Sequence, residues 1–171
     1  MCKLRDLLAA NSWKEADTET ANLISELSEK NDLDGSWCNE VREIDRLWVE
    51  YSNHRFGFSV QNELYNFFGA KRDYDKVAWE RFGDSVGWRV EKKWIAQYCI
   101  FDLTAPHGHL PVMGTWTESN DDYPSDKWHG WSLGTSGWYS DATGWHREDI
   151  SDLQHSNFTY FMSKITSCTN L

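Results

Sequence analysis

Hydrophobic residues recur every three or four positions along the first part of the chain, which is the spacing of an amphipathic helix. Ser12 and Glu15 fit a capping box, in which each side chain bonds a free amide of the other residue at the start of a helix. The positions that would face the core follow at Trp13, Ala16, Thr20, Leu23, Ile24 and Leu27. This helix is expected to end in the polar stretch NDLDG at 31–35.

Three more helices are predicted over residues 39–51, 59–68 and 73–82, and the turns SNHRFG and GDSVGW follow the first and the last of them. The first two each have an apolar face. It consists of Val41, Ile44, Leu47, Trp48 and Tyr51 in one helix and of Val60, Leu64, Phe67 and Phe68 in the other.

The pattern becomes less regular after these helices. Residues 94–103 fit a strand or a helix, and APHGHLP must be irregular because its prolines break helices. From 112 to 148, Gly, Ser, Thr and Asp alternate with tryptophans, and TSGWYSD is echoed by ATGWHRE, which is too little for a repeat fold. A loop of this length in a compact chain is usually functional or mobile.

A last helix is predicted over 149–167, with its core-facing positions at Ile150, Leu153, Phe158, Phe161, Met162 and Ile165. Together these patterns predict an all-α fold class. We expect one mostly helical domain over residues 1–171, with long irregular loops and with residues 112–148 as a Trp-rich acidic insertion.

Charge and hydropathy limit the function classes. The net charge of -10 argues against a nucleic-acid partner, because such binding depends on neutralising phosphates. No apolar run approaches the roughly 18 residues of a membrane helix. The N-terminal stretch MCKLRDLLAANSW is too weakly apolar for a signal peptide and lacks the character of a transit peptide. We therefore expect that the chain works where it is made, or that a leader is missing from this sequence.

The cysteines and tryptophans each allow two interpretations. The four cysteines are widely spread without a CxxC pair, so free thiols in a reducing compartment are the expectation. The eleven tryptophans either close the core of a small protein or form a surface for a flat apolar ligand. Composition alone does not separate these two roles.

No catalytic constellation stands out. Residues 83–87 match the GxSxG pattern of serine hydrolases, but that motif needs a strand before it and a helix after it, and neither is predicted. His107 and His109 could contribute to a metal site, but no further ligands lie nearby, so His109 is expected to fix a turn through its ring nitrogens. No glycine-rich phosphate loop follows a strand.

Four segments, taken in order, resemble one family. SWKEADTET opens a helix with a Trp-x-x-Ala-Asp pattern, and IDRLWVEYSNHRFGFSVQ, FGDSVGWR and FDLTAPHGHLP follow at 44–61, 82–89 and 101–111. In this order they resemble the Genomes-Uncoupled-Four domain of cyanobacteria and plastids, and ISDLQHSNFTYFMSKITSC resembles the ending of many members.

The resemblance implies a cupped helical domain that is not an enzyme. Members of this family bind porphyrins, chiefly protoporphyrin and its magnesium form, and stimulate magnesium chelatase in chlorophyll synthesis. The implied function is a non-catalytic tetrapyrrole-binding regulator or carrier in chlorophyll or bilin synthesis. Its implied ligand is a porphyrin or magnesium-porphyrin, with a bilin as a further candidate.

A porphyrin is an apolar disc with anionic propionates at one edge, so its faces favour apolar side chains and its rim favours cations. The resemblance makes Arg55 a partner for a propionate, with Lys92 or Lys93 as further rim cations. The candidate ligand-binding residues are Arg55, Phe58, Val60, Arg89, Lys93, Leu110, Trp116, Trp128 and Trp131. The alternative is that Phe56, Phe58 and Val60 are core residues and that Arg55 pairs with an acidic side chain.

The sequence also departs from the family. Studied members place arginines shortly after GHLP, whereas here VMGTWTESNDDYPSD has no cation before Lys127. Either the ligand stacks on tryptophans, or the chain is a protein-interaction or sensor subunit that has lost its pigment. The implied partners are the large subunit of magnesium chelatase or a photosynthetic complex, with peripheral membrane association left open. The implied location is the cytoplasm of a cyanobacterium or the plastid stroma.

Overall fold

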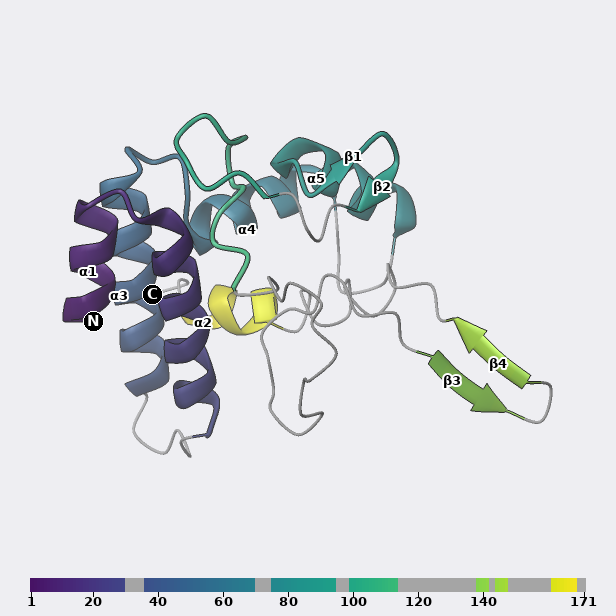
Figure 1. Ribbon diagram of the computed structural model, residues 1–171, viewed down its shortest axis with the longest axis horizontal. Helices are drawn as coiled ribbons and strands as arrows, with labels where there is room; N and C mark the ends of the chain where they lie inside the picture. The colour runs from purple at the N-terminus through teal and green to yellow at the C-terminus, as the bar shows by residue number, and fades with distance from the viewer. Residues whose placement is uncertain are drawn as a thin grey trace.

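The computed structural model describes residues 1–29, 36–69, 75–94, 99–113, 138–141, 144–147 and 161–168. The helices are α1 (Cys2–Ala9), α2 (Trp13–Glu29), α3 (Ser36–Tyr51), α4 (Phe58–Phe67) and α5 (Lys76–Val86), and residues 161–168 are also helical. In Figure 1, α1, α2 and α3 lie side by side and each contacts the other two, so they form a three-helix bundle, and α4 and α5 continue the structure beyond it. The prediction of a mostly helical fold is confirmed.

Every predicted helix has a counterpart in the described residues, but one further helix was not predicted, α3 begins three residues earlier than predicted, and α5 ends four residues later. Helix α1 was not anticipated, although it buries Leu4 and Leu8. Helix α5 runs through the stretch GDSV, which the pattern predicted as a turn. It begins where the Asp75 side chain accepts bonds from two backbone amides, and it ends at Gly87, which is left-handed with φ 73°.

The core-facing positions predicted for α4 are confirmed only in part, since Val60 is buried and Leu64 and Phe68 are partly buried against the core. The structure buries Phe58, Val60, Gln61 and Tyr65, whereas Phe67 is 79% exposed. The prediction that Phe67 faces the core is therefore wrong. The reason is that Gln61, a polar residue, turns inward to bond another segment, and this fixes the rotation of the helix.

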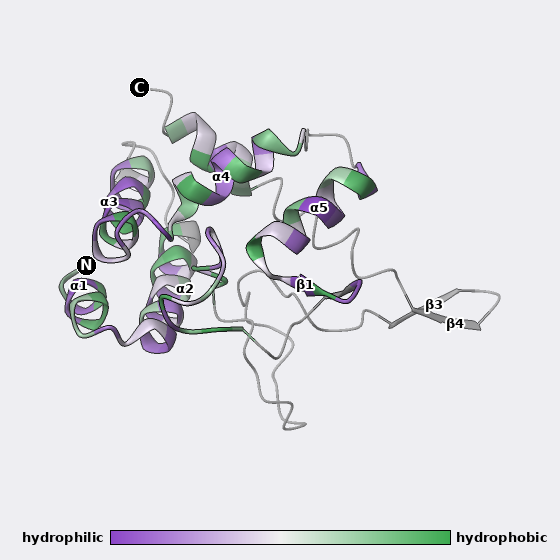
Figure 2. Cartoon of the chain, turned by 90° about the horizontal axis from the view of Figure 1, so that it is seen from above, coloured by the Kyte–Doolittle hydropathy of each residue, from purple (hydrophilic) through white to green (hydrophobic). Residues whose placement is uncertain are grey.

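Aromatic rings form much of the core. The five tryptophans whose side chains are described there are all buried: Trp13, Trp37, Trp48, Trp79 and Trp88. Rings meet edge to face, as between Trp13 and Phe56 at 5.6 Å, or stacked, as between Trp79 and Phe82 at 5.5 Å. Figure 2 shows hydrophobic and hydrophilic residues on different faces of the helices. For these five tryptophans, the core role is confirmed.

Two antiparallel hairpins complete the described structure. In the first, β1 (Arg89–Val90) pairs with β2 (Lys93–Trp94). In the second, β3 (Trp138–Asp141) pairs with β4 (Gly144–Arg147), with Trp138 opposite Arg147. The sequence echo within TSGWYSD and ATGWHRE thus forms the two arms of a hairpin, where the pattern predicted only loop.

The last helix is shorter than the prediction in its described part, and it carries a disulfide. Phe161, Met162 and Ile165 face the core as predicted, and the rest of the predicted helix up to residue 160 lies outside the described residues. Cys168 forms a disulfide with Cys38 at the start of α3. The expectation of free thiols is therefore wrong for this pair, because the fold brings together two cysteines that are 130 residues apart, whereas Cys2 and Cys99 are free.

Candidate functional site

Residues 105–113, APHGHLPVM, form a segment that we call the strap. It contains neither helix nor strand, as predicted, yet Ala105, Leu110, Val112 and Met113 are almost fully buried. A buried irregular segment must find partners for its backbone amides and carbonyls. Those partners come from each of the other three sequence segments that carried the family resemblance.

The first partner is Asp17 on α2. Its side chain is fully buried, and one carboxylate oxygen, Oδ1, accepts bonds from the amides of Val112 at 2.6 Å and Met113 at 2.9 Å. A carboxylate that accepts two amide bonds is a strong anchor because each bond is charge-assisted. Asp17 therefore ties the end of the strap to the three-helix bundle of α1, α2 and α3.

The second set of partners comes from the turn before α4 and from α4 itself. Arg55 donates through Nε to the carbonyl of Ala105 at 2.7 Å, and its own carbonyl accepts the amide of Gly108 at 2.9 Å. Gln61 donates through Nε2 to two strap carbonyls, those of Gly108 at 3.0 Å and Pro111 at 2.9 Å. The motif FGFSVQ is thus a binding surface for the strap.

The third set comes from the end of α5. The amide of Ile100 donates to Nε2 of His109 at 3.1 Å, so that nitrogen is an acceptor. The proton therefore sits on Nδ1, which donates to the carbonyl of Val86 at 2.6 Å. Trp88 in turn donates through Nε1 to the carbonyl of His109 at 2.8 Å. The expectation that His109 fixes a turn through both ring nitrogens is confirmed.

Burial lowers the pKa of His109, which keeps its imidazole neutral in this network. Its neighbour His107 is exposed, and within the described ranges no three His, Cys, Asp or Glu side chains lie together as metal ligands would. Within the described residues, His109 therefore acts on the strap through both of its ring nitrogens.

Two glycines let the chain pass at these crossings. Gly57 has φ +136°, and a Cβ there would lie 2.8 Å from Asp45 Oδ1. Gly108 has φ +75°, and its Cβ would lie 2.7 Å from Leu64 Cδ1. Side chains larger than hydrogen do not fit at either position without movement, which explains why the motifs carry glycine.

The apolar residues predicted to contact a ligand lie in or beside the core. Phe58 and Leu110 have no exposed surface, and Val60 is 8% exposed. The Phe58 ring meets Phe161 edge to face, with 5.1 Å between centroids. We call these apolar residues, together with the groups that hold the strap, the frame. Within the frame, the ring of Phe58 is covered.

The predicted rim cations differ in how readily they could bind a propionate. Arg89 donates to both oxygens of Asp84 at 2.9 Å and lies 3.1 Å from Glu80, and its side chain is 9% exposed. A propionate would have to compete with both carboxylates for Arg89. Arg55 is half-buried against the strap, and Lys92 is exposed at the turn of the β1–β2 hairpin.

Four predicted ligand residues lie wholly or partly outside the described part of the chain. These are Trp116, Trp128 and Trp131, and the side chain of Lys93 in β2. The structure brings Arg55, Phe58, Val60 and Leu110 to the strap and its neighbourhood, and it places Arg89 in β1, shortly after α5 and its C-cap Gly87.

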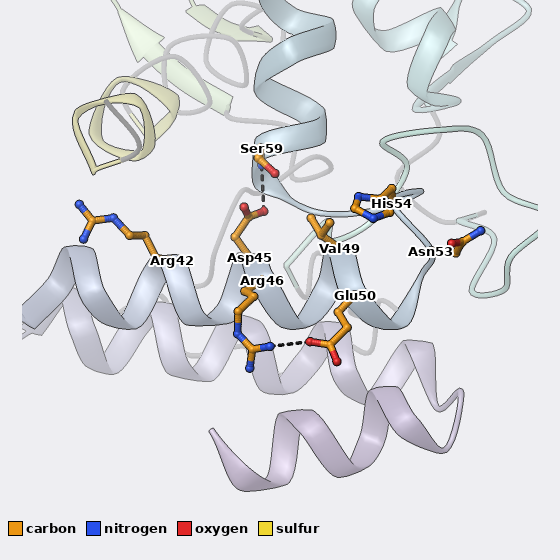
Figure 3. Close-up of a pocket in the computed structure, with 8 residues that line it drawn as sticks. All are labelled: Arg42, Asp45, Arg46, Val49, Glu50, Asn53, His54 and Ser59. Carbon is orange, nitrogen blue, oxygen red and sulfur yellow. Dashed lines mark hydrogen bonds and ion pairs between the residues drawn. The ribbon is translucent and has the colours of Figure 1, made fainter. Parts of the chain in front are cut away.

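A groove of about 510 Å3 lies along the outer face of α3, and none of the predicted ligand residues lines it. Figure 3 shows Asp45 pointing toward Ser59 at the start of α4, while Arg46 and Glu50 pair with each other. Asp45 accepts the Ser59 amide at 2.9 Å and so caps α4, and burial raises its pKa. Sequence reasoning missed this groove because its residues have the spacing of an ordinary solvent-facing helix surface.

The GxSxG match has no hydrolase context. Gly83 and Ser85 lie within the last turns of α5, whereas a nucleophile elbow needs a turn between a strand and a helix.

None of the helices that the structure describes has the length and hydropathy of a membrane span.

The fold defined by this frame is that of a small helical domain with a strap held against it, and it resembles known structures. The ligand-free structure of Arabidopsis thaliana GUN4 superimposes with a TM-score of 0.53 at 24% identity, over 66% of this chain and 83% of that one. The structure of GUN4 from Chlamydomonas reinhardtii gives a TM-score of 0.53 at 29% identity, over 67% of this chain and 80% of that one.

The GUN4-like family model matches residues 1–121, and the chain belongs to that family. A relative from Arabidopsis thaliana, named tetrapyrrole-binding protein, chloroplastic, is 25% identical over an alignment of 125 residues, and the match covers 64% of this chain and 46% of the relative. A Ycf53-like protein of Synechocystis sp. is 29% identical over an alignment of 120 residues, and that match covers 64% of this chain and 49% of the relative. The chain thus spans about half the length of the curated relatives that it matches.

Proposed function

We propose that this protein is a non-catalytic tetrapyrrole-binding protein, a regulator or carrier in chlorophyll or bilin synthesis. The observation that carries the proposal is the family match over residues 1–121, joined to the name of the Arabidopsis relative. The strap supports it, because all four motif segments meet there and build one frame.

The ligand we propose is a porphyrin or magnesium-porphyrin, with a bilin as the further candidate. Phe58, Val60 and Leu110 supply an apolar frame at one side of the strap, which suits the face of a flat ring. Arg55 would meet a propionate with its guanidinium nitrogens other than Nε, which is bound to Ala105. Lys92 is a second cation that a propionate could reach without displacing a carboxylate.

The tryptophans of the acidic segment are proposed as stacking partners for the ring, in place of the arginines that studied members carry after GHLP. We further propose the large subunit of magnesium chelatase or a photosynthetic complex as the protein partner. The proposed location is the cytoplasm of a cyanobacterium or the plastid stroma, since the matched relatives include proteins of Synechocystis and of the Arabidopsis chloroplast.

A second candidate function is a protein-interaction or sensor subunit without pigment. The observation that favours it is the pairing of Arg89 with Glu80 and Asp84, which removes one of the few cations expected at the rim. Phe67, 79% exposed at the end of α4, is an apolar side chain that a protein partner could cover.

The test is a titration of the purified chain with protoporphyrin, magnesium protoporphyrin and a bilin, followed by quenching of tryptophan fluorescence. Saturable quenching at one ligand per chain is expected for one of the three. Arg55→Ala should weaken binding by roughly 1.5–3 kcal/mol if Arg55 bonds a propionate. The exposed Arg81→Ala on α5 is the matched control and should leave affinity unchanged.

Since Arg55 also holds the strap, the unfolding midpoint of each variant is measured in parallel. An Arg55→Ala protein that is folded and binds as tightly as wild type removes Arg55 from the ligand site. Absence of quenching by all three pigments at micromolar concentration overturns the pigment function and favours the interaction subunit.

A further inference from the structure

The helix at 161–168 covers the apolar frame described above. Phe161 and Phe58 are both buried, with their rings edge to face at 5.1 Å, and Met162 and Ile165 are buried on the same helix. Because Phe58 has no exposed surface and its ring meets that of Phe161, a pigment that contacts this side of the ring must displace Phe161. The position of this helix therefore affects the access to that side of Phe58.

Besides its buried apolar side chains, this helix makes polar contacts with α3 and α4. Arg42 donates through Nε to the carbonyl of Cys168 at 2.6 Å, and Lys164 lies 5.5 Å from the centroid of the Trp37 ring. Thr166 donates to the Asn62 side chain at 3.3 Å. Apolar packing, these polar contacts and one covalent bond together hold residues 161–168 against the rest of the fold.

The covalent attachment is the disulfide between Cys168, at the end of this helix, and Cys38 on α3. Their Cα atoms are 5.0 Å apart, and 130 residues separate them in sequence. Cys168 is fully buried, whereas Cys38 is only partly buried, so an attacking thiolate can approach at Cys38. In a reducing compartment, disulfides are usually transient and serve in redox sensing.

We infer that the Cys38–Cys168 disulfide is a redox lock that holds helix 161–168 over Phe58 and so restricts pigment access. The inference rests on the proposed tetrapyrrole function. A dithiol reductant opens the lock in two steps. One thiolate attacks Cys38 Sγ, the sulfur–sulfur bond breaks, and Cys168 leaves as a thiolate that takes a proton. The second thiol of the reductant then displaces Cys38, so that the reductant becomes a disulfide and both cysteines become thiols.

Opening the lock raises the fraction of molecules in which helix 161–168 can move off Phe58. The apparent dissociation constant equals the intrinsic constant divided by the fraction of molecules competent to bind. Reduction is therefore expected to tighten pigment binding. An increase of about tenfold in affinity would correspond to a tenfold increase in that fraction.

The experiment compares the full chain before and after treatment with dithiothreitol, using protoporphyrin as the probe. Alkylation under denaturing conditions and mass measurement report the redox state: two labels are expected for the oxidised chain, from Cys2 and Cys99, and four after reduction. Hydrogen exchange of residues 161–168 reports release of the helix. The double variant C38S/C168S should behave as the reduced protein without reductant, and Cys2→Ser, at an exposed free cysteine, is the control.

Faster exchange at 161–168 together with tighter protoporphyrin binding, in reduced wild type and in the double variant, supports the lock. Equal affinity in both redox states, with saturable binding in each, overturns the lock and leaves the pigment function in place. Unchanged exchange at 161–168 after complete reduction also overturns it. If no binding occurs in either state while exchange rises, the helix lock is supported and the pigment function is overturned.

Discussion

Asp17 is the residue whose removal tests the strap most directly. Its Oδ1 accepts the amides of Val112 and Met113, and all three residues are buried. In Asp17→Ala both amides lose their partner in a site closed to water. Each buried amide left unpaired costs about 1–3 kcal/mol, so the variant should lose about 2–6 kcal/mol of unfolding free energy. That is a large share of the roughly 5–15 kcal/mol of a typical domain.

Asp17→Asn keeps an oxygen that can accept both amides and removes only the charge. The loss should then be near 1–2 kcal/mol, since charge-assisted bonds are about twice as strong as neutral ones. The assay is urea unfolding at one pH, followed by tryptophan fluorescence and far-ultraviolet circular dichroism. Asp6→Ala is the control, because Asp6 is an exposed carboxylate paired with its neighbour Arg5.

The expected order of stability is wild type and Asp6→Ala, then Asp17→Asn, then Asp17→Ala. If Asp17→Ala does not fold, the comparison of Asp17→Asn with wild type still measures the charge-assisted part. An Asp17→Ala protein as stable as Asp6→Ala would refute the idea that this carboxylate anchors the strap.

Three further predictions concern single residues of the same frame, each measured by urea unfolding. Gly57→Ala should lose about 2–4 kcal/mol of unfolding free energy, because φ at this position is +136° and the new Cβ would lie 2.8 Å from Asp45 Oδ1. Gly69→Ala should lose only about 1–2 kcal/mol, because φ is +72° but nothing lies within 4 Å of the new Cβ. Similar losses in the two variants would contradict the close approach at Gly57. The pKa of His109 is lowered in the folded chain, so the unfolded chain takes up the proton at a higher pH than the folded chain does. The unfolding free energy therefore falls as the pH drops below the ordinary histidine pKa of 6.5, by up to about 1.36 kcal/mol per pH unit. His109→Gln should remove this slope and His107→Gln should keep it, and an unchanged slope in the first would refute the assignment. Asp45→Ala should lose about 1 kcal/mol, because it uncaps α4, and Asp45→Asn should lose less; equal losses would argue against the cap.

The sequence predicts those parts of the fold that depend on neighbouring residues. The apolar period identified α2, α3 and α4, and the residues from Phe161 to Ile165 that face the core. Helix α1 was not predicted because its eight residues are too few to show a helical period, and only Leu4 and Leu8 among them are buried. The stretch GDSVGW has the composition of a turn, but α5 continues through GDSV and ends at Gly87.

Contacts between distant residues could not be predicted from spacing. Asp17 and the strap amides are 95 and 96 residues apart, and Gln61 and its carbonyl partners are 47 and 50 apart. The disulfide joins cysteines at a separation of 130. No local pattern marks such partners, since only the assembled fold decides which polar groups become buried together.

In the candidate ligand site, the sequence likewise does not show which cations are free to bind a ligand. The sequence shows that Arg89 is a cation near a motif, but it does not show that Glu80 and Asp84 lie on the neighbouring turns of α5 and take up that charge. Likewise Arg55 reads as a free cation, although its Nε is bound to the carbonyl of Ala105. Available charge depends on the partners that folding brings close, and a sequence gives only the inventory.

The residue types in the motifs are hard to replace, because each of these residues contacts the strap or passes close to another segment. Gln61 spends its amide protons on two strap carbonyls, and His109 uses both ring nitrogens. Gly57 and Gly108 leave no room for a side chain. The Gln61 amide protons and both ring nitrogens of His109 are therefore committed to the strap. A match in these motifs thus indicates the fold, whereas the choice of ligand must be set by residues around the strap, such as Lys92, and by the movement that uncovers Phe58.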